Sequence, residues 1–164
     1  MKKTVLMLLA LATVIVPAAL ASTPAQAPST YCKANTGLIG AGKTYKTMGD
    51  CVSKQAALAT ASRVNAARTC KAEMADTTFA NTHANKTFDQ FYGTTADNGK
   101  GKGNSNAYGN CVSQKSSSKT AQQQTAQVNA AKKCRNAPLK DQIGAAPKTF
   151  RNFGACVAAQ TKLA

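Results

Sequence analysis

Residues 37–44 read GLIGAGKT and match the phosphate-binding loop pattern G-x-x-x-x-G-K-[ST] in full. In a nucleotide-binding protein this loop follows a hydrophobic strand and opens a long helix, whose first amides bind the phosphates. Here residues 31–35 precede the loop without a strand pattern, and Gly49 follows almost at once. The corresponding loop at residues 143–149 has Pro147 where the pattern requires glycine. We therefore attribute the match to an internal repeat and expect no nucleotide.

The other residue types that carry chemistry form no catalytic arrangement. His83 is the only histidine, and the cysteines lack the C-x-x-C spacing of zinc sites. The carboxylates are scattered and form no spaced pair with a second catalytic group; they are Asp50, Glu73, Asp76, Asp89, Asp97 and Asp141. The sequence therefore predicts no catalytic residue, no metal and no cofactor, which means a protein that is not an enzyme.

Internal repetition is the strongest pattern in the chain. One phrase occurs three times, at residues 43–51 (KTYKTMGDC), 86–93 (KTFDQFYG) and 148–156 (KTFRNFGAC). A second phrase occurs twice, at residues 64–71 (VNAARTCK) and 128–135 (VNAAKKCR). Copied units organised around cysteines indicate a small repeat protein.

Two segments favour long helices, because residues 51–71 and 111–135 contain neither Gly nor Pro and are rich in Ala. We expect Asp50 and Asn110, each preceded by glycine, to cap their N-termini. Basic residues in the last turns complement the helix dipole. A shorter helix is expected from residue 156 to 163. The predicted fold is all-α: short helical repeats cross-linked by disulfides, with two long helices and short connecting turns.

The Lys-Thr-aromatic phrase spaces its large apolar residues three apart, which places both on one side of a helical turn. The pairs are Tyr45 and Met48, Phe88 and Phe91, and Phe150 and Phe153. Gly49, Gly93 and Gly154 follow these turns and are expected to end them in the left-handed conformation. We interpret the aromatic pairs as core anchors and not as a platform for stacking a ligand.

The six cysteines are expected to form three disulfides: Cys32, Cys51, Cys70, Cys111, Cys134 and Cys156. Cys51 and Cys70 would lie about 28 Å apart along one helix, and Cys111 and Cys134 about 35 Å, so neither pair can be bridged. The simplest remaining scheme joins the end of each helix to the start of the next. It pairs Cys32 with Cys51, Cys70 with Cys111, and Cys134 with Cys156.

The chain opens with two lysines, an apolar run and small residues, the order of a secretory signal peptide over residues 1–21. The alternative is an uncleaved anchor, but Pro17 interrupts the run, which is short of the about 20 residues that span a membrane. Residues 22–31 are expected to form a flexible leader, and residues 32–164 a single disulfide-stapled helical repeat domain.

Without residues 1–21 the chain keeps 19 basic and 6 acidic residues, a net charge of +13. Only 16 of these 143 residues are Val, Leu, Ile or Phe, so disulfides must supply much of the stability. The positive charge either keeps a weakly folding exported protein soluble or attracts a polyanion, such as a wall polymer, acidic polysaccharide or anionic lipid surface. Lys100 and Lys102, in a Gly-rich insertion, are the expected first contacts. No nucleic-acid module is present, so sequence-specific nucleic-acid binding is not expected.

At NAA[KR]xC, FYG and NAYGNCVS, the chain resembles a group of uncharacterised exported bacterial proteins built from cysteine-bearing repeats. The resemblance covers residues 43–157. It implies secretion and repetition and carries no activity.

The sequence thus favours a secreted or envelope-associated, non-enzymatic structural or binding module that binds polyanions. The alternatives are a cationic membrane-active or antimicrobial factor and an enzyme of a class that the sequence does not display. A membrane-active helix needs a broad apolar stripe, whereas residues 111–135 contain only Val112 and Val128 as large apolar residues.

Overall fold

A computed structural model describes residues 24–93, 106–145 and 147–163. Its α-helices are α1 (Pro28–Ala34), α2 (Met48–Ala75), α3 (Phe79–Thr82), α4 (Phe88–Tyr92), α5 (Ala107–Arg135) and α6 (Phe153–Lys162), with short 3₁₀ helices η1 (Thr36–Leu38) and η2 (Lys140–Gln142). The described residues contain no strand, which confirms the all-α prediction. The predicted signal peptide and the two lysines of the Gly-rich insertion lie outside the described residues.

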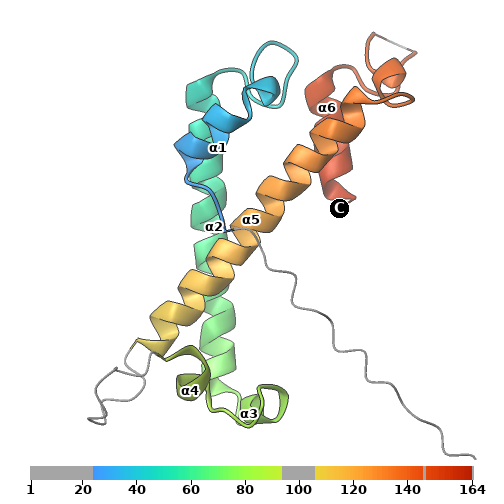
Figure 1. Cartoon of the computed structure of the whole chain (residues 1–164). Helices are drawn as coiled ribbons and strands as arrows, with labels where there is room; N and C mark the ends of the chain where they lie inside the picture. The colour runs from blue at the N-terminus through green and yellow to red at the C-terminus, as the bar shows by residue number, and fades with distance from the viewer. Residues whose placement is uncertain (1–23, 94–105, 146, 164) are drawn as a thin grey trace, which may run out of the picture.

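Helices α2 and α5 cross each other and form the frame of the molecule (Figure 1). Helix α1 lies beside α2 and α6 beside α5 at one end of this frame, and α3 and α4 lie at the other end. Ser62 of α2 lies 3.4 Å from Oε1 of Gln123 of α5, and small residues of both helices, among them Ser62, Ala66 and Ala121, are buried. Small side chains let the two backbones approach closely, which suits a chain with few large apolar residues.

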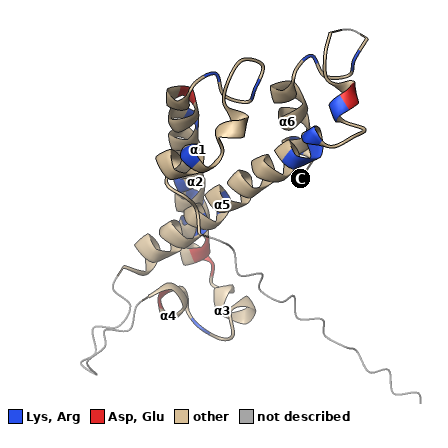
Figure 2. Cartoon of the chain, turned by 45° about the horizontal axis from the view of Figure 1, so that its top comes forward, with Lys and Arg blue, Asp and Glu red and all other residues tan. Residues whose placement is uncertain are grey.

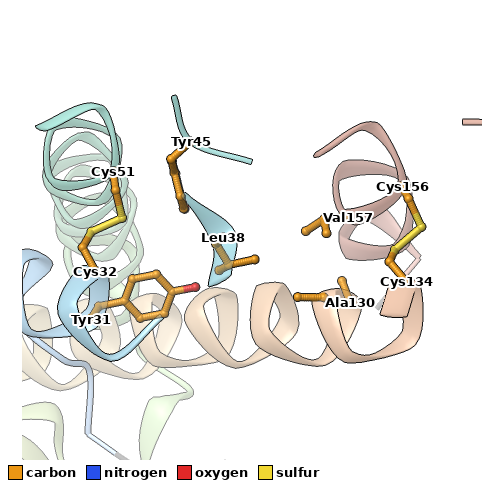
Figure 3. Close-up of a cluster of buried hydrophobic side chains, with 10 residues drawn as sticks. Tyr31, Cys32, Leu38, Tyr45, Cys51, Ala130, Cys134, Cys156 and Val157 are labelled. Atoms are coloured by element: carbon orange, nitrogen blue, oxygen red, sulfur yellow. A yellow bond between two sulfur atoms is a disulfide. The ribbon is translucent and has the colours of Figure 1, made fainter. Parts of the chain in front are cut away.

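The predicted disulfide pairing is confirmed. Cys32 is bonded to Cys51, Cys70 to Cys111 and Cys134 to Cys156, with Cα–Cα distances of 6.0, 6.0 and 6.1 Å. All six cysteines are fully buried and none is free. Two bridges belong to the core cluster beside α1 and α6, shown in Figure 3, and the third to a smaller cluster beside α3 and α4.

Helix α1 begins at Pro28, within the segment expected to be a leader, and buries Tyr31. Proline suits the first turn of a helix, where its missing N–H removes no hydrogen bond. Gln26 also exchanges two hydrogen bonds with the side chain of Gln124, at 2.9 and 3.0 Å. Residues 28–31 therefore belong to the packed domain and not to a flexible segment.

The predicted N-caps of the long helices are wrong by several residues. Thr47 caps α2 by accepting a hydrogen bond from the Asp50 amide, so Asp50 lies in the first turn. Its carboxylate accepts from the Lys46 amide, which holds the pKa of Asp50 below its ordinary value. Asn106, at a φ of 71°, precedes α5, and Asn110 instead donates to the carbonyl of Tyr92.

The prediction that a left-handed glycine ends each aromatic turn is wrong for all three phrases. Gly49 and Gly154 lie in the first turns of α2 and α6, so they open helices and do not end them. Gly93 does follow α4, but its φ is −68° and not left-handed. Left-handed glycines occur earlier, at Gly42 and Gly144, inside the loops that lead to α2 and α6.

Candidate polyanion-binding site

Two cations from distant parts of the chain converge on one aromatic ring. Nζ of Lys43 lies 4.6 Å from the ring centroid of Phe153, and Cζ of Arg135 lies 5.6 Å from the same centroid. Lys43 belongs to the loop between η1 and α2, Arg135 is the last residue of α5, and Phe153 is the first residue of α6. We call Lys43, Arg135 and Phe153 the basic junction.

The backbone of the first loop holds the basic junction together. Gly42 adopts a φ of 71°, and its carbonyl accepts a 2.9 Å hydrogen bond from the amide of Gly154. A Cβ atom at Gly154 would lie 2.5 Å from the carbonyl oxygen of Lys43, so glycine is required for this approach. The guanidinium of Arg135 lies over Gly37, which also has no side chain in the way.

The two loops that lead to α2 and α6 have the same hydrogen-bond pattern. Gly40 donates to the carbonyl of Tyr45 and Gly144 to that of Phe150, each at 2.8 Å. Each loop also forms an isolated bridge, Ile39 with Tyr45 and Ile143 with Phe150. The phosphate-loop match at residues 37–44 therefore folds as a 3₁₀ turn and a bridge, without the strand and following helix that nucleotide binding needs.

The positive charges of Lys43 and Arg135 are not neutralised by an ion pair among the described residues. Across the described ranges the ion pairs are Lys54–Asp50 at 3.2 Å and Lys115–Glu73 at 2.9 Å, and neither involves Lys43 or Arg135. The cations of Lys132 and Lys133 are exposed in the same last turn of α5, where Figure 2 shows basic residues gathered beside α6. Asp141 is the only carboxylate between residues 136 and 152. This end of the molecule therefore carries a clear excess of positive charge.

A cleft of about 360 Å³ lies between α1 and α5, and none of the residues of the basic junction lines it. Asn35, Asn129 and Lys132 line it, and Lys132 lies three residues before Arg135 on the same side of the helix. Amides and an ammonium next to two further cations can bind a chain of anionic groups by hydrogen bonds and charge attraction.

A buried network of polar side chains anchors Tyr45, which belongs to the loop before α2. The phenols of Tyr31 and Tyr45 both donate to Oε1 of Gln127, at 3.0 and 2.9 Å, and Gln55 donates to the Tyr45 oxygen at 2.7 Å. Burial raises the pKa of both tyrosines above the ordinary value, with Tyr45 adding to the effect at Tyr31. Both phenols are therefore neutral at physiological pH and act as hydrogen-bonding supports, not nucleophiles.

His83 serves packing in this structure. Its ring stacks on Phe79 with a centroid distance of 3.7 Å, and its Nδ1 lies 2.8 Å from the Phe79 carbonyl oxygen. Within residues 24–93, 106–145 and 147–163, no group of three His, Cys, Asp or Glu side chains could hold a metal ion.

The sequence did not identify the basic junction. It placed Arg135 in a last turn that complements the helix dipole and Phe153 among core anchors, and it gave Lys43 no role beyond the rejected nucleotide motif. The signal that could have pointed to this end of the chain is the basic run at residues 132–135. Lys100 and Lys102 stay a prediction.

No family model matches the chain, and neither curated proteins nor solved structures show a match to it. In the described part of the chain, no helix has the length and apolar character to cross a membrane.

Proposed function

We propose that this chain is a secreted, non-enzymatic binding or structural module that binds polyanions at the cell envelope. The observation that carries the proposal is the convergence of Lys43 and Arg135 on Phe153 without a carboxylate partner. The three disulfides support a location in an oxidising compartment outside the cytosol.

The site favours a polymer over a single small anion. The junction cations and the lysines of the last α5 turn are exposed, so their charges spread over a surface and not into a closed pocket. Such a surface gains affinity by releasing counterions from a densely charged chain, and it does not read a sequence. Wall polymers, acidic polysaccharides and anionic lipid surfaces all present this chemistry.

The test is retention of the purified protein on an anionic polymer column over a range of salt concentrations. Replacing Lys43 and Arg135 by Gln removes two cations, and the slope of log affinity against log salt is expected to fall by about 2. The matched control replaces Lys71 and Arg68, which are exposed on α2, and removes the same two residue types. The variant with Lys43→Arg and Arg135→Lys keeps both charges and should retain the wild-type slope.

Two outcomes contradict the proposal in different ways. Equal losses in the junction variant and the α2 control show that attraction is diffuse and that the basic junction is not a site. Failure of the wild-type protein to bind at about 50 mM salt, where screening is mild, excludes polyanion binding and leaves solubility as the role of the charge. A third variant, with Lys100 and Lys102 replaced by Gln, tests the contacts that the sequence predicted.

A further inference from the structure

A groove of about 330 Å³ lies between α4 and the first half of α5. Helix α4 is at the end of the molecule opposite α6, to which Phe153 of the basic junction belongs (Figure 1). Its walls mix apolar and polar chemistry: Phe91 and Tyr92 from α4, and Gln114, Ser118, Lys119 and Gln122 from α5. We call it the α4–α5 groove.

The aromatic wall of the groove is fixed before any ligand arrives. Phe91 is 44% exposed, an unusual state for one of only five phenylalanines in the chain. Its ring centroid lies 4.7 Å from that of His83 and 4.9 Å from that of Tyr92, with interplanar angles of 77° and 83°. Tyr92 is itself held by a 3.1 Å hydrogen bond to Glu73. A rigid exposed ring loses little conformational entropy when it binds an apolar surface.

The opposite wall is a row of hydrogen-bonding groups. Gln114, Ser118 and Gln122 are spaced four residues apart, so they lie along one face of α5. Their amides and hydroxyl can each donate and accept hydrogen bonds. A wall of this kind complements a ligand that presents neighbouring hydroxyl groups.

The charge of the groove is a single unpaired cation. Burial lowers the pKa of Lys115, but its hydrogen bonds to Glu73 and Tyr92 outweigh that effect and raise the pKa, so Lys115 stays charged and is neutralised by Glu73. Lys119 lies one turn further along α5, is exposed, and takes part in neither ion pair of the described residues. The groove therefore offers one positive charge beside hydroxyl-complementary groups and an apolar ring.

We propose that the α4–α5 groove binds an acidic oligosaccharide. The C–H face of a sugar ring packs on Phe91, its hydroxyls bond to the glutamines and Ser118, and its carboxylate meets Lys119. A bare phosphate chain has no apolar face for Phe91 and no hydroxyl row for α5, so it fits the groove less well. The inference rests on the proposed polyanion function and narrows its ligand to an acidic polysaccharide.

The experiment measures binding of three probes to the purified protein by calorimetry at about 0.15 M salt, where the screening length is about 8 Å. The probes are an oligomer of galacturonic acid, a neutral glucose oligomer of the same length, and linear polyphosphate of the same charge. We expect galacturonate to bind most tightly. Phe91→Ala should weaken this binding about tenfold, the loss of one stacked aromatic contact. Lys119→Gln should reduce galacturonate affinity to that of the neutral oligomer.

The matched control is Met74→Ala, which removes an apolar side chain that is 53% exposed on α2 and should leave galacturonate binding unchanged. If Phe91→Ala unfolds the α4 end, Gln122→Ala replaces it, because Gln122 is exposed and outside the core. Galacturonate binding that is insensitive to every groove variant overturns the inference, and so does polyphosphate binding lost through Phe91→Ala.

The two proposals fail separately. Groove variants that leave galacturonate binding intact, while the Lys43 and Arg135 variant weakens column retention, refute the groove and leave the basic junction standing. The opposite pattern refutes the basic junction and supports the groove.

Discussion

At the end of the molecule that carries α1 and α6, two disulfides enclose a cluster with small apolar partners such as Ala130 and Val157. At the end that carries α3 and α4, one disulfide is packed among Phe79, Phe88 and Tyr92. The first end is fixed by covalent bonds and by the loop contact between Gly42 and Gly154. The second end has a single bridge and relies more on aromatic packing. Both ends bury aromatic rings, because Tyr31 and Tyr45 belong to the first cluster, so the difference lies in the number of cross-links: two where the loops are copied and one where the copy diverges.

The divergence is visible in the repeated phrase itself. In the first copy, Thr44 and Tyr45 are in a loop and the helix starts three residues later, whereas in the second copy Thr87 caps α4 and Phe88 opens it. Thr87 and Gln90 form a reciprocal capping box there, with hydrogen bonds of 3.0 and 3.3 Å. The second copy lacks the preceding Ile-Gly loop that pairs with the aromatic residue in the other two. The shared Lys-Thr-aromatic phrase thus folds differently in the two copies because the residues around it differ.

Reducing the disulfides should have the largest effect on both ends. Chain entropy gives about 3 to 4 kcal/mol for each bridge, and the Cys70–Cys111 bridge, which closes the longest loop, gives the most. Together these contributions are comparable to the whole free energy of unfolding of a small domain. We expect reductant to abolish most of the helical circular dichroism signal. An unchanged signal and melting temperature would show that the aromatic and alanine packing suffices alone.

Alkaline pH should weaken the α1 end next. Tyr31 and Tyr45 have raised pKa values in the folded state, so their stabilising effect is complete below about pH 10 and is lost as the pH rises. Above about pH 10 the tyrosine ionises in the unfolded chain but stays protonated in the folded protein. The free energy of unfolding therefore falls by about 1.4 kcal/mol per pH unit for each such tyrosine. Urea unfolding as a function of pH measures this.

The control for the pH effect replaces Tyr31 and Tyr45 by Phe, which should leave a shallower slope. The remaining slope should come from Tyr92 and Lys115 at the other end, whose pKa values are also raised in the folded state. A slope that the double variant does not change would contradict the assignment to the α1 end.

Gly154→Ala should destabilise the protein by about 1 to 3 kcal/mol, because the added carbon would clash with the backbone of Lys43. The neighbouring Gly42 carbonyl is hydrogen-bonded to the Gly154 amide, so this loop cannot move away easily. Gly49 occupies the same position in the first copy, where an added carbon would meet only the Thr47 hydroxyl, at 3.9 Å. Gly49→Ala should therefore be neutral or stabilising through helix propensity. Thermal unfolding of the two variants compares the copies directly, and equal effects would show that the close approach at Gly154 has no energetic role.

The smallest expected effect is at the N-caps. Thr87→Ala removes the hydrogen bond that the Thr87 hydroxyl accepts from the Gln90 amide, and it should cost about 1 kcal/mol, with faster hydrogen exchange confined to α4. Thr47→Ala removes one hydrogen bond at α2, where the Cys32–Cys51 bridge also fixes the first turn. Exchange in α2 should change less than in α4. A larger change in α2 would contradict the division between a cross-linked and an aromatic end.

The disulfide pairing was predictable in two steps. The rise of a helix excludes bridges between residues 51 and 70 and between 111 and 134, and the simplest of the remaining schemes, which joins the end of each helix to the start of the next, is the one that forms. The helix starts were not predictable to the residue, because Asp50 and Asn110 are good capping types that are used for other hydrogen bonds. The basic junction could not be predicted, because Lys43, Arg135 and Phe153 are brought together only by tertiary contacts. The α4–α5 groove was missed because Phe91 was expected to be a core anchor and is instead partly exposed.

The hydrogen bond between Gly42 and Gly154 joins residues that lie 112 positions apart. The Cys32–Cys51 bridge, in contrast, spans 19 positions and can close as soon as its own loop is made. During synthesis the first loop is therefore complete in sequence long before its docking partner exists. The end of the molecule that carries α1 and α6 can therefore complete its packing only after residues 153–157 have been made. Docking of the loop before α6 then fixes the position of the loop before α2.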